Sequence, residues 1–212
     1  MDNTFSYKDF IDETGDFTSL FESVTNVWEV LPKIEDFIKE FSKTPQASEY
    51  TQISENVFVG KDVVIDSTSK IDGMAIIGHN STIGHAAFVR GGVLIGNNVN
   101  VGHATEVKHS VILSNSALAH LNYVGDSIVG NDVNVSGGAT LANFRLDRKS
   151  VDVKIGDTRI PTGLEKFGSV IGDGTIVGVN AVLNPGTILA KKTIIYPLVV
   201  VKGAYREATT FK

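Results

Sequence analysis

The side chains best suited to chemistry lie in residues 116–126, which read SALAHLNYVGD. His120 is of most interest there, because an imidazole with an unperturbed pKa near 6.5 can accept a proton near neutral pH. General-base catalysis of this kind contributes roughly 10²–10⁴-fold in rate. A lone histidine is more often structural than catalytic. Tyr123, Asn134 and Lys149 accompany this one, so we favour a catalytic role.

Fixed cations that could bind a phosphate follow a regular spacing. Arg90 and Lys108 are 18 residues apart. If one coil of the fold takes 18 residues, both cations can reach one phosphate from adjacent coils. Residues 144–169 are also rich in basic side chains: Arg145, Arg148, Lys149, Lys154, Arg159 and Lys166. Acidic residues interleave with them, so this segment could equally be a solvated surface of mixed charge.

A period of six residues underlies the elements that must position these groups. The repeated positions are all Ile, Val or Leu: Ile53, Val59, Ile65, Ile71, Ile77, Ile83, Val89, Ile95, Val101, Val107 and Leu113. A helix needs apolar residues near every 3.6 and a single strand needs every second residue, so neither explains a period of six. A triangular coil does, with three short strands a turn and the aliphatic residue pointing inward. The repeat predicts an all-β prism of stacked parallel strands.

The register of the repeat breaks twice. It stops after Leu113 and resumes at Val129, and it stops again before Ile171. The first interruption contains residues 119–127 and the second runs over about 144–169. Departures from a solenoid usually build the binding face, so we expect function at both. The alternative is that both are tolerated insertions.

Residues 1–50 follow a different pattern. Apolar residues recur there at intervals of three and four, which predicts amphipathic helices interrupted near Pro32. We expect this segment to cap the open end of the prism, which otherwise exposes its core and unpaired strand edges. Docking of a partner is the alternative. The prism itself is predicted over residues 51–206.

Composition excludes several classes of function. A net charge of −5 argues against a nucleic-acid partner. No apolar run is long enough for a membrane span, and the N-terminus lacks the features of a secretory signal. The chain has no cysteine, which removes disulfides and thiolate metal sites and fits a cytoplasmic location.

The run SALAHLNYVGD, followed by NDVNVSGGATLANF and DRKS on a hexapeptide prism, carries a family resemblance. It resembles the acetyltransferase domain of the bifunctional N-acetylglucosamine-1-phosphate uridylyltransferase/glucosamine-1-phosphate acetyltransferase family. The archaeal sugar-phosphate nucleotidylyltransferase form is the most similar, since a segment like DTRIPTGLEKFGSVIGDG interrupts its prism too. The resemblance covers about residues 53–203. It implies a left-handed parallel β-helix of hexapeptide repeats, assembled as a homotrimer.

The activity implied by this resemblance is N-acetylation of an amino-sugar 1-phosphate similar to glucosamine 1-phosphate. Acetyl-CoA would be the co-substrate, and no metal would be required for acetyl transfer. His120 matches the general base, and Asn143 matches an asparagine that the adjacent subunit offers to the acetyl group. The matched substrate contacts are Arg90, Lys108, Tyr123, Asn134 and Lys149. The matched cofactor contacts are Gly137 at the acetyl end and Val179 and Pro197 along the pantetheine arm.

Such a reaction makes chemical demands that these residues meet. The attacking amine must lose a proton, and the thioester oxygen gains negative charge. A backbone N–H or the Asn143 amide could stabilise that charge, at about 10²-fold or more per donor. Because a convex prism has no deep pocket, the site should form between neighbouring prisms of a trimer.

Three departures from the family keep other functions open. The chain lacks the nucleotidyltransferase domain, Phe144 stands where the family commonly has tyrosine, and the tail after Gly203 is short. One alternative is a non-catalytic sugar-phosphate-binding or trimerisation module that partners a separate nucleotidyltransferase. A less favoured alternative is a relative of the γ-class carbonic anhydrases. His85 and His103 lie one coil apart, but the His-x4-His pair of that class is missing.

Overall fold

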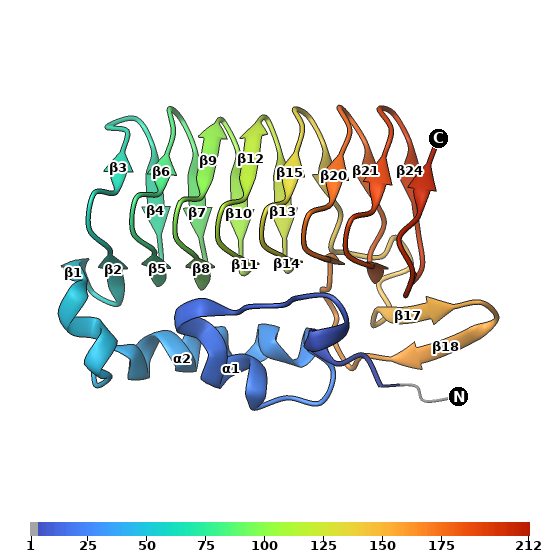
Figure 1. Ribbon diagram of the computed structural model, residues 1–212, viewed down its shortest axis with the longest axis horizontal. Coiled ribbons are helices and arrows are strands. Elements are labelled where there is room, and N and C mark those ends of the chain that lie inside the picture. Colours follow the sequence, from blue (N-terminus) through green and yellow to red (C-terminus); the bar gives the residue numbers. More distant parts are fainter. Residues whose placement is uncertain (1–3) are drawn as a thin grey trace.

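The computed structural model describes residues 4–212, which form a triangular prism of three sheets with helices along one side (Figure 1). Sheet 1 contains β1 (Thr51–Ser54), β2 (Val57–Val59), β5 (Ala75–Ile77), β8 (Val93–Ile95), β11 (Val111–Ile112), β14 (Ile128–Val129), β19 (Ser169–Ile171) and β22 (Thr187–Leu189). Sheet 2 contains β3 (Val64–Ile65), β6 (Thr82–Ile83), β9 (Asn100–His103), β12 (Ala117–His120), β15 (Asn134–Val135), β20 (Ile176–Val177), β23 (Ile194–Ile195) and β25 (Thr210–Phe211). Sheet 3 contains β4 (Lys70–Asp72), β7 (Phe88–Arg90), β10 (Glu106–Lys108), β13 (Tyr123–Gly125), β16 (Thr140–Leu141), β21 (Val182–Leu183) and β24 (Val200–Val201).

Successive coils pair in parallel, whereas β1 runs antiparallel to β2. The prism interior holds ladders of mainly aliphatic side chains from successive strands. On sheet 1 the ladder of register partners is Ile77, Ile95, Ile112, Val129, Ile171 and Leu189. Branched aliphatic residues fit such a pleated surface closely. The predicted fold, an all-β left-handed parallel β-helix with a helical segment ahead of it, is confirmed.

Two coils are one residue shorter than the predicted 18. Ile95 pairs with Ile112, and Ile112 pairs with Val129, so each step is 17 residues. Ile112 therefore points inward, and Leu113 joins the apolar cluster outside the prism. The predicted first interruption is wrong, because residues 119–127 belong to the regular strands β12 and β13 and the turns that follow them. Ile53 is not part of the ladder, contrary to the prediction, because it lies in β1 and is 53% exposed.

Between β16 and β19 the chain leaves the prism. Residues 142–168 include an antiparallel hairpin of β17 (Asp152–Ile155) and β18 (Thr158–Pro161). Val151, Val153 and Phe167 from this excursion are buried against sheet 1 and the helices.

The N-terminal segment contains two α-helices, α1 (Thr18–Glu22) and α2 (Ile34–Phe41). Its 3-10 helices are Tyr7–Asp9, Gly15–Phe17, Val27–Lys33 and Pro45–Glu49. Pro32 falls inside the third of these, and α2 begins two residues later.

The helical segment covers the outer face of sheet 1 (Figure 1). Outward residues of sheet 1 are buried beneath it: Phe58, Ile76, Leu94, Val111, Ile128, Val170 and Ile188. Trp28 is central to this contact, with its ring 6.2 Å from that of Phe167. The segment therefore lies along one side of the prism and not over the end, where we expected it.

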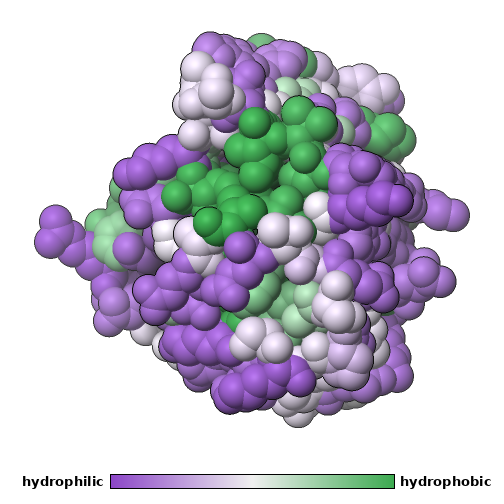
Figure 2. All heavy atoms as spheres, turned by 90° about the vertical axis from the view of Figure 1, so that its left-hand side faces the viewer, coloured by the Kyte–Doolittle hydropathy of each residue, from purple (hydrophilic) through white to green (hydrophobic). Residues whose placement is uncertain are grey.

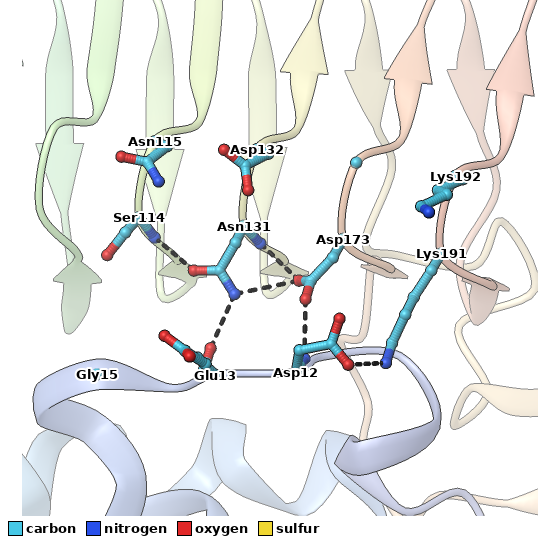
Figure 3. A pocket seen from close by; sticks show the side chains of 11 residues that line it. Asp12, Glu13, Gly15, Ser114, Asn115, Asn131, Asp132, Asp173, Lys191 and Lys192 are labelled. Carbon is cyan, nitrogen blue, oxygen red and sulfur yellow. Dashed lines mark hydrogen bonds and ion pairs between the residues drawn. The ribbon is translucent and has the colours of Figure 1, made fainter.

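Polar contacts fasten the start of this segment to the last coils. Asp12 pairs with Lys191, and the Asp12 N–H donates to Asp173 Oδ2 at 2.8 Å. Arg206 Nη1 lies 3.3 Å from Asp9 Oδ2. Figure 3 shows Asp12, Asp173 and Lys191 around a pocket of about 460 Å³ on the edge between sheets 1 and 2. At the other end of the segment the Phe41 ring lies 5.2 Å from that of Phe58 on the first coil.

The end of the prism at β3 and β4 carries an apolar surface (Figure 2). Val64 is 60% exposed there, and Ile65 and Ile71 are only partly buried. Among residues 4–212 no helix has the length and apolarity needed to cross a membrane.

Candidate active site

Sheet 3 and the two edges of the prism that flank it hold most of the predicted site residues. The 2–3 edge joins sheets 2 and 3, and it carries His120 at the end of β12. Successive coils continue this edge with the three predicted cofactor contacts: Gly137, Val179 and Pro197. Backbone hydrogen bonds of 2.9–3.1 Å connect the coils at these positions. The predicted base and the predicted cofactor contacts therefore share one edge.

The His120 side chain lies outside the aliphatic interior and is exposed. Its ring rests on the backbone of Gly137, where an added Cβ would lie 2.6 Å from Nε2. A side chain at position 137 would therefore displace the imidazole. His103 is the register partner of His120, and the rings of His85 and His103 stack at 5.2 Å and 7°.

The outer face of sheet 3 carries the predicted phosphate-binding cations. Arg90 and Lys108 are register partners on β7 and β10, so they stack on adjacent coils. Each is already paired with a carboxylate. Arg90 Nε donates to Glu106 Oε1 at 2.7 Å, and Lys108 Nζ donates to both oxygens of Asp126 at 2.8 and 3.1 Å.

Asp126 lies on the 3–1 edge, which joins sheets 3 and 1, and its side chain is 6% exposed. Besides Lys108, it accepts a hydrogen bond from Asn143 Nδ2 and contacts His109 Nδ1 at 3.0 Å. We call these four residues the Asp126 cluster. Burial raises the pKa of Asp126, but the hydrogen bonds from His109, Lys108 and Asn143 outweigh it and lower the pKa below its usual value. The cluster therefore keeps a charged carboxylate inside the edge.

Tyr123 and Asn143 meet beside this cluster. Tyr123 begins β13 and is partly buried, and Asn143 is buried just after β16. A Cβ at Gly125 would lie 2.6 Å from the Tyr123 hydroxyl and 2.7 Å from Asn143 Nδ2, so glycine leaves room for both groups. Burial, with the negative charges of Asp126 and Glu106, raises the pKa of Tyr123 above its usual value.

Two predicted substrate contacts lie apart from this face within one chain. Asn134 is exposed on the outer face of sheet 2, where its Nδ2 donates to Ser136 Oγ at 3.3 Å. Lys149 is exposed in the excursion, and its N–H donates to Asp147 Oδ1 at 3.3 Å. Neither joins Tyr123 unless a second chain brings it there.

The basic side chains of the excursion are partly neutralised. Arg145 forms a two-bond ion pair with Asp147, and Arg159 Nη1 lies 3.8 Å from Asp152 Oδ2. For these two arginines the structure agrees with a surface of mixed charge. No group of three or more His, Asp or Glu side chains within residues 4–212 is arranged to hold a metal ion.

Three polar residues of this region were not assigned from the sequence: Glu106, His109 and Asp126. Asp126 is the last residue of the run SALAHLNYVGD, but no role was predicted for it. Its signal was the 18-residue step from Lys108. A carboxylate and an ammonium group one coil apart are expected to pair on a solenoid.

A family model matches most of the residues that form the prism. The family model of the GMPPB C-terminal domain matches residues 71–203. The bifunctional sugar-1-phosphate nucleotidylyltransferase/acetyltransferase of Sulfurisphaera tokodaii is 38% identical over 97 residues, or 46% of this chain and 24% of that protein. The bifunctional protein GlmU of Methanococcus vannielii is 40% identical over 81 residues, or 38% of this chain and 19% of that protein.

The chain thus spans about a quarter or less of the length of these curated relatives. Among solved structures, a predicted acetyltransferase from Bacillus cereus matches 71% of this chain and 80% of its own, with a TM-score of 0.52 and 15% identity. That likeness concerns the fold alone. The names of the curated relatives confirm the predicted resemblance to the bifunctional sugar-phosphate enzymes. The family model matches residues 71–203, which is more than half of this chain, so the chain belongs to the GMPPB C-terminal domain family.

Proposed function

We propose that this protein is an N-acetyltransferase that transfers the acetyl group of acetyl-CoA to an amino-sugar 1-phosphate, with His120 as general base. The proposal extends to this chain what the names of its relatives say of them. One observation carries it. An exposed imidazole lies against Gly137 on the same edge as Val179 and Pro197, and the neighbouring sheet face carries two cations.

The proposed chemistry uses His120 to remove a proton. The sugar amine attacks the thioester carbonyl carbon, and the nitrogen gives its proton to the imidazole as the C–N bond forms. The C–S bond then breaks, and the imidazolium returns the proton to the leaving thiolate of coenzyme A. An exposed imidazole can take up and return a proton in this way near neutral pH.

The phosphate of the sugar would bind the donors that Arg90 and Lys108 still have free. Glu106 uses Nε of Arg90, which leaves the two terminal nitrogens of the guanidinium for a phosphate. Lys108 has three donors, and the contacts to Asp126 use two. The carboxylates thus hold the cations in place and leave part of each available.

A homotrimer completes the proposed site. Asn134 and Lys149 lie away from Tyr123 within one chain, so a neighbouring copy must supply them or they do not act. Sheet 1 is covered by the helical segment, which leaves sheets 2 and 3 for contact with other copies. The cytoplasmic location stays a prediction.

A thiol-release assay tests the activity directly. Purified protein is mixed with acetyl-CoA and a panel of amino-sugar 1-phosphates that includes glucosamine and galactosamine 1-phosphate. We expect release of coenzyme A that depends on one of these sugars, and a loss of about 10²–10⁴-fold in kcat with His120→Ala. The matched control is His85→Ala, an exposed histidine two coils away on the same edge, which should keep its activity.

The second candidate is a non-catalytic module that binds sugar phosphates or trimerises a separate nucleotidyltransferase. The observation in its favour is that the curated relatives are bifunctional and about four or more times as long as the matched regions. This candidate predicts sugar-phosphate binding in calorimetry without any coenzyme A release, and equal binding by the wild type and His120→Ala.

A further inference from the structure

The 3–1 edge contains a buried carboxylate for which the proposed reaction has no direct use. Asp126 contacts residues of the coil above and the coil below it, since Lys108 and His109 precede it by one coil and Asn143 follows it by one. Its backbone is fixed on both sides as well. The Asp126 N–H donates to Lys108 O at 2.8 Å, and its carbonyl accepts from Gly168 N at 2.8 Å.

A carboxylate in this position determines the orientation of the Asn143 amide. An ionised carboxylate only accepts hydrogen bonds, so the amide must turn its Nδ2 toward Asp126 and its oxygen away. The same argument makes His109 Nδ1 the protonated nitrogen facing Asp126. The amide therefore has one defined orientation, with one Nδ2 hydrogen on Asp126 and the second left to donate to a group that binds beside Tyr123.

The same carboxylate restricts Lys108. Its ammonium group is held to both Asp126 oxygens, and the side chain is only 19% exposed. A free lysine has many rotamers, and ordering them on substrate binding costs free energy. Asp126 orders this side chain before any phosphate arrives.

The tight turn makes this arrangement possible. Val107 to Ile112 and Val124 to Val129 are the two steps of five residues, and both cross the 3–1 edge. Asp126 adopts a left-handed conformation there, with φ of 45°. Asn and Asp tolerate that region better than most residues, so the short turn and the carboxylate occur together.

We propose that Asp126 is a positioning residue of the transferase, which fixes Lys108 toward the sugar phosphate and the Asn143 amide toward the acetyl group. The proposal rests on the proposed function. Asp126 touches neither substrate. It acts through its two partners, one for each half of the reaction.

The test is a steady-state comparison of the full-length protein with the near-isosteric variant Asp126→Asn. We expect kcat/KM for the sugar phosphate to fall about 10²-fold, as for a catalytic group displaced by about 1 Å. Both a rise in KM for the sugar phosphate and a fall in kcat should contribute, while KM for acetyl-CoA stays unchanged. The matched control is Asp132→Asn, an exposed aspartate with nearly the same backbone conformation (φ of 55°), which should keep the wild-type constants.

A double-mutant cycle separates positioning from a general loss of structure. In an Asn143→Ala background, Asp126→Asn should cost much less than it does alone, because one of its targets is gone. His109→Ala removes the third partner of Asp126 and leaves the other two, so it should change kcat/KM less than threefold.

Each remaining outcome has a clear meaning. If the wild type releases no coenzyme A with any sugar tested, the proposed function fails and the role of Asp126 falls with it. If the wild type is active and Asp126→Asn retains its constants, the positioning role alone is wrong. Equal losses in the wild-type and Asn143→Ala backgrounds, or a loss with His109→Ala as large as with Asp126→Asn, would also overturn it. If Asp126→Asn does not fold, two other measurements still decide the question. One is the His109→Ala result, and the other is Lys108→Met measured with and without Asn143→Ala. The proposal requires Lys108 to affect KM for the sugar phosphate and Asn143 to affect kcat, each separately.

Discussion

At the scale of single residues, the position of His120 depends on the absence of a side chain at Gly137. Gly137 lets the imidazole rest against the backbone of the next coil, and the ring stays outside the aliphatic interior. A ring buried among the ladders would have ruled out proton transfer to a substrate. The exposed position of the His120 ring is compatible with proton transfer to a substrate.

Gly137→Ala should therefore reduce activity more than stability. The added Cβ would fall 2.6 Å from Nε2 and force the ring off the coil. We expect kcat to drop about tenfold or more, since small displacements of a catalytic group are costly. Coenzyme A release and thermal unfolding measured side by side check this. The control is Gly156→Ala at the hairpin tip, where a Cβ meets nothing within 4 Å but the backbone is left-handed, with φ of 56°. This variant should lose stability and keep its activity, and a large loss of activity there would argue against the explanation.

The lowered pKa of Asp126 predicts acid sensitivity. The carboxyl binds protons more weakly in the folded protein than in the unfolded chain, where its pKa is about 3.9. Its contribution to stability is therefore complete above that value and is lost as pH falls through the folded pKa. Urea unfolding at pH 6 and pH 3 should show a smaller drop in the free energy of unfolding for Asp126→Asn than for the wild type. Equal drops would mean that Asp126 does not carry this dependence.

A site residue could be predicted from the sequence only where its residue type and spacing by themselves indicate its role. His120, Arg90 and Lys108 were recognisable from residue type, resemblance and spacing. The pairing of both cations with carboxylates was not foreseen, because Asp126 and Glu106 look like ordinary acidic surface residues until the coil length fixes their neighbours. The separation of Asn134 from Tyr123 follows from the sheet on which each strand lies, which a one-dimensional motif does not contain.

At the scale of elements, the coil length decides which residues face inward. The hexapeptide period predicted the prism correctly, and on sheet 1 it placed Ile77, Ile95, Val129, Ile171 and Leu189 in the inward ladder but missed Ile112. We expected an interruption at residues 119–127 because two coils are one residue shorter than the others. A shorter coil shifts the period of the sequence but does not break a strand. Ladders of similar aliphatic residues hide such a shift, since Ile112 and Leu113 are both apolar.

The position of the helical segment could not be read from its own pattern. Amphipathic helices predict that one face is buried, and they do not say against what. The missing clue lay in the outward positions of sheet 1, where Phe58, Ile76 and Leu94 occupy places that solvent would otherwise reach. Those residues predict a covered side of the prism.

Trp28→Ala should be strongly destabilising for this reason. Trp28 is 2% exposed and packs between the prism, the helices and Phe167. Removing a buried aromatic side chain costs about 3–5 kcal/mol. Chemical denaturation measures the loss, and Leu146→Ala is the control, because Leu146 is fully exposed and its truncation should cost less than about 0.5 kcal/mol. A similar cost for both would show that the segment is not part of the folded core.

At the scale of the whole molecule, the proposed reaction requires more than one chain. One prism presents His120 on the 2–3 edge and Asn143 on the 3–1 edge, at opposite sides of sheet 3. A neighbouring copy can bring the second edge to the first.

Mixing two weakened variants tests this arrangement. His120→Ala and Asn143→Ala are purified, unfolded together and refolded as a one-to-one mixture. If each site takes its histidine from one copy and its asparagine from the next, random assembly restores about a quarter of the sites. The coenzyme A release of the mixture should then exceed that of either variant refolded alone, and light scattering should give the mass of three chains. Activity that is simply the mean of the two variants would place both residues on one chain.

The N-terminal segment has a consequence for how the prism comes apart. In most solenoids each turn touches only the turns next to it, so the ends fray first and stability varies along the axis. Here one stretch of chain touches Phe58 on the opening coil and Lys191 and Arg206 near the close. It works as a strap along the full axis, and the coils it binds should open together, with amide exchange rates that show little gradient from one end to the other.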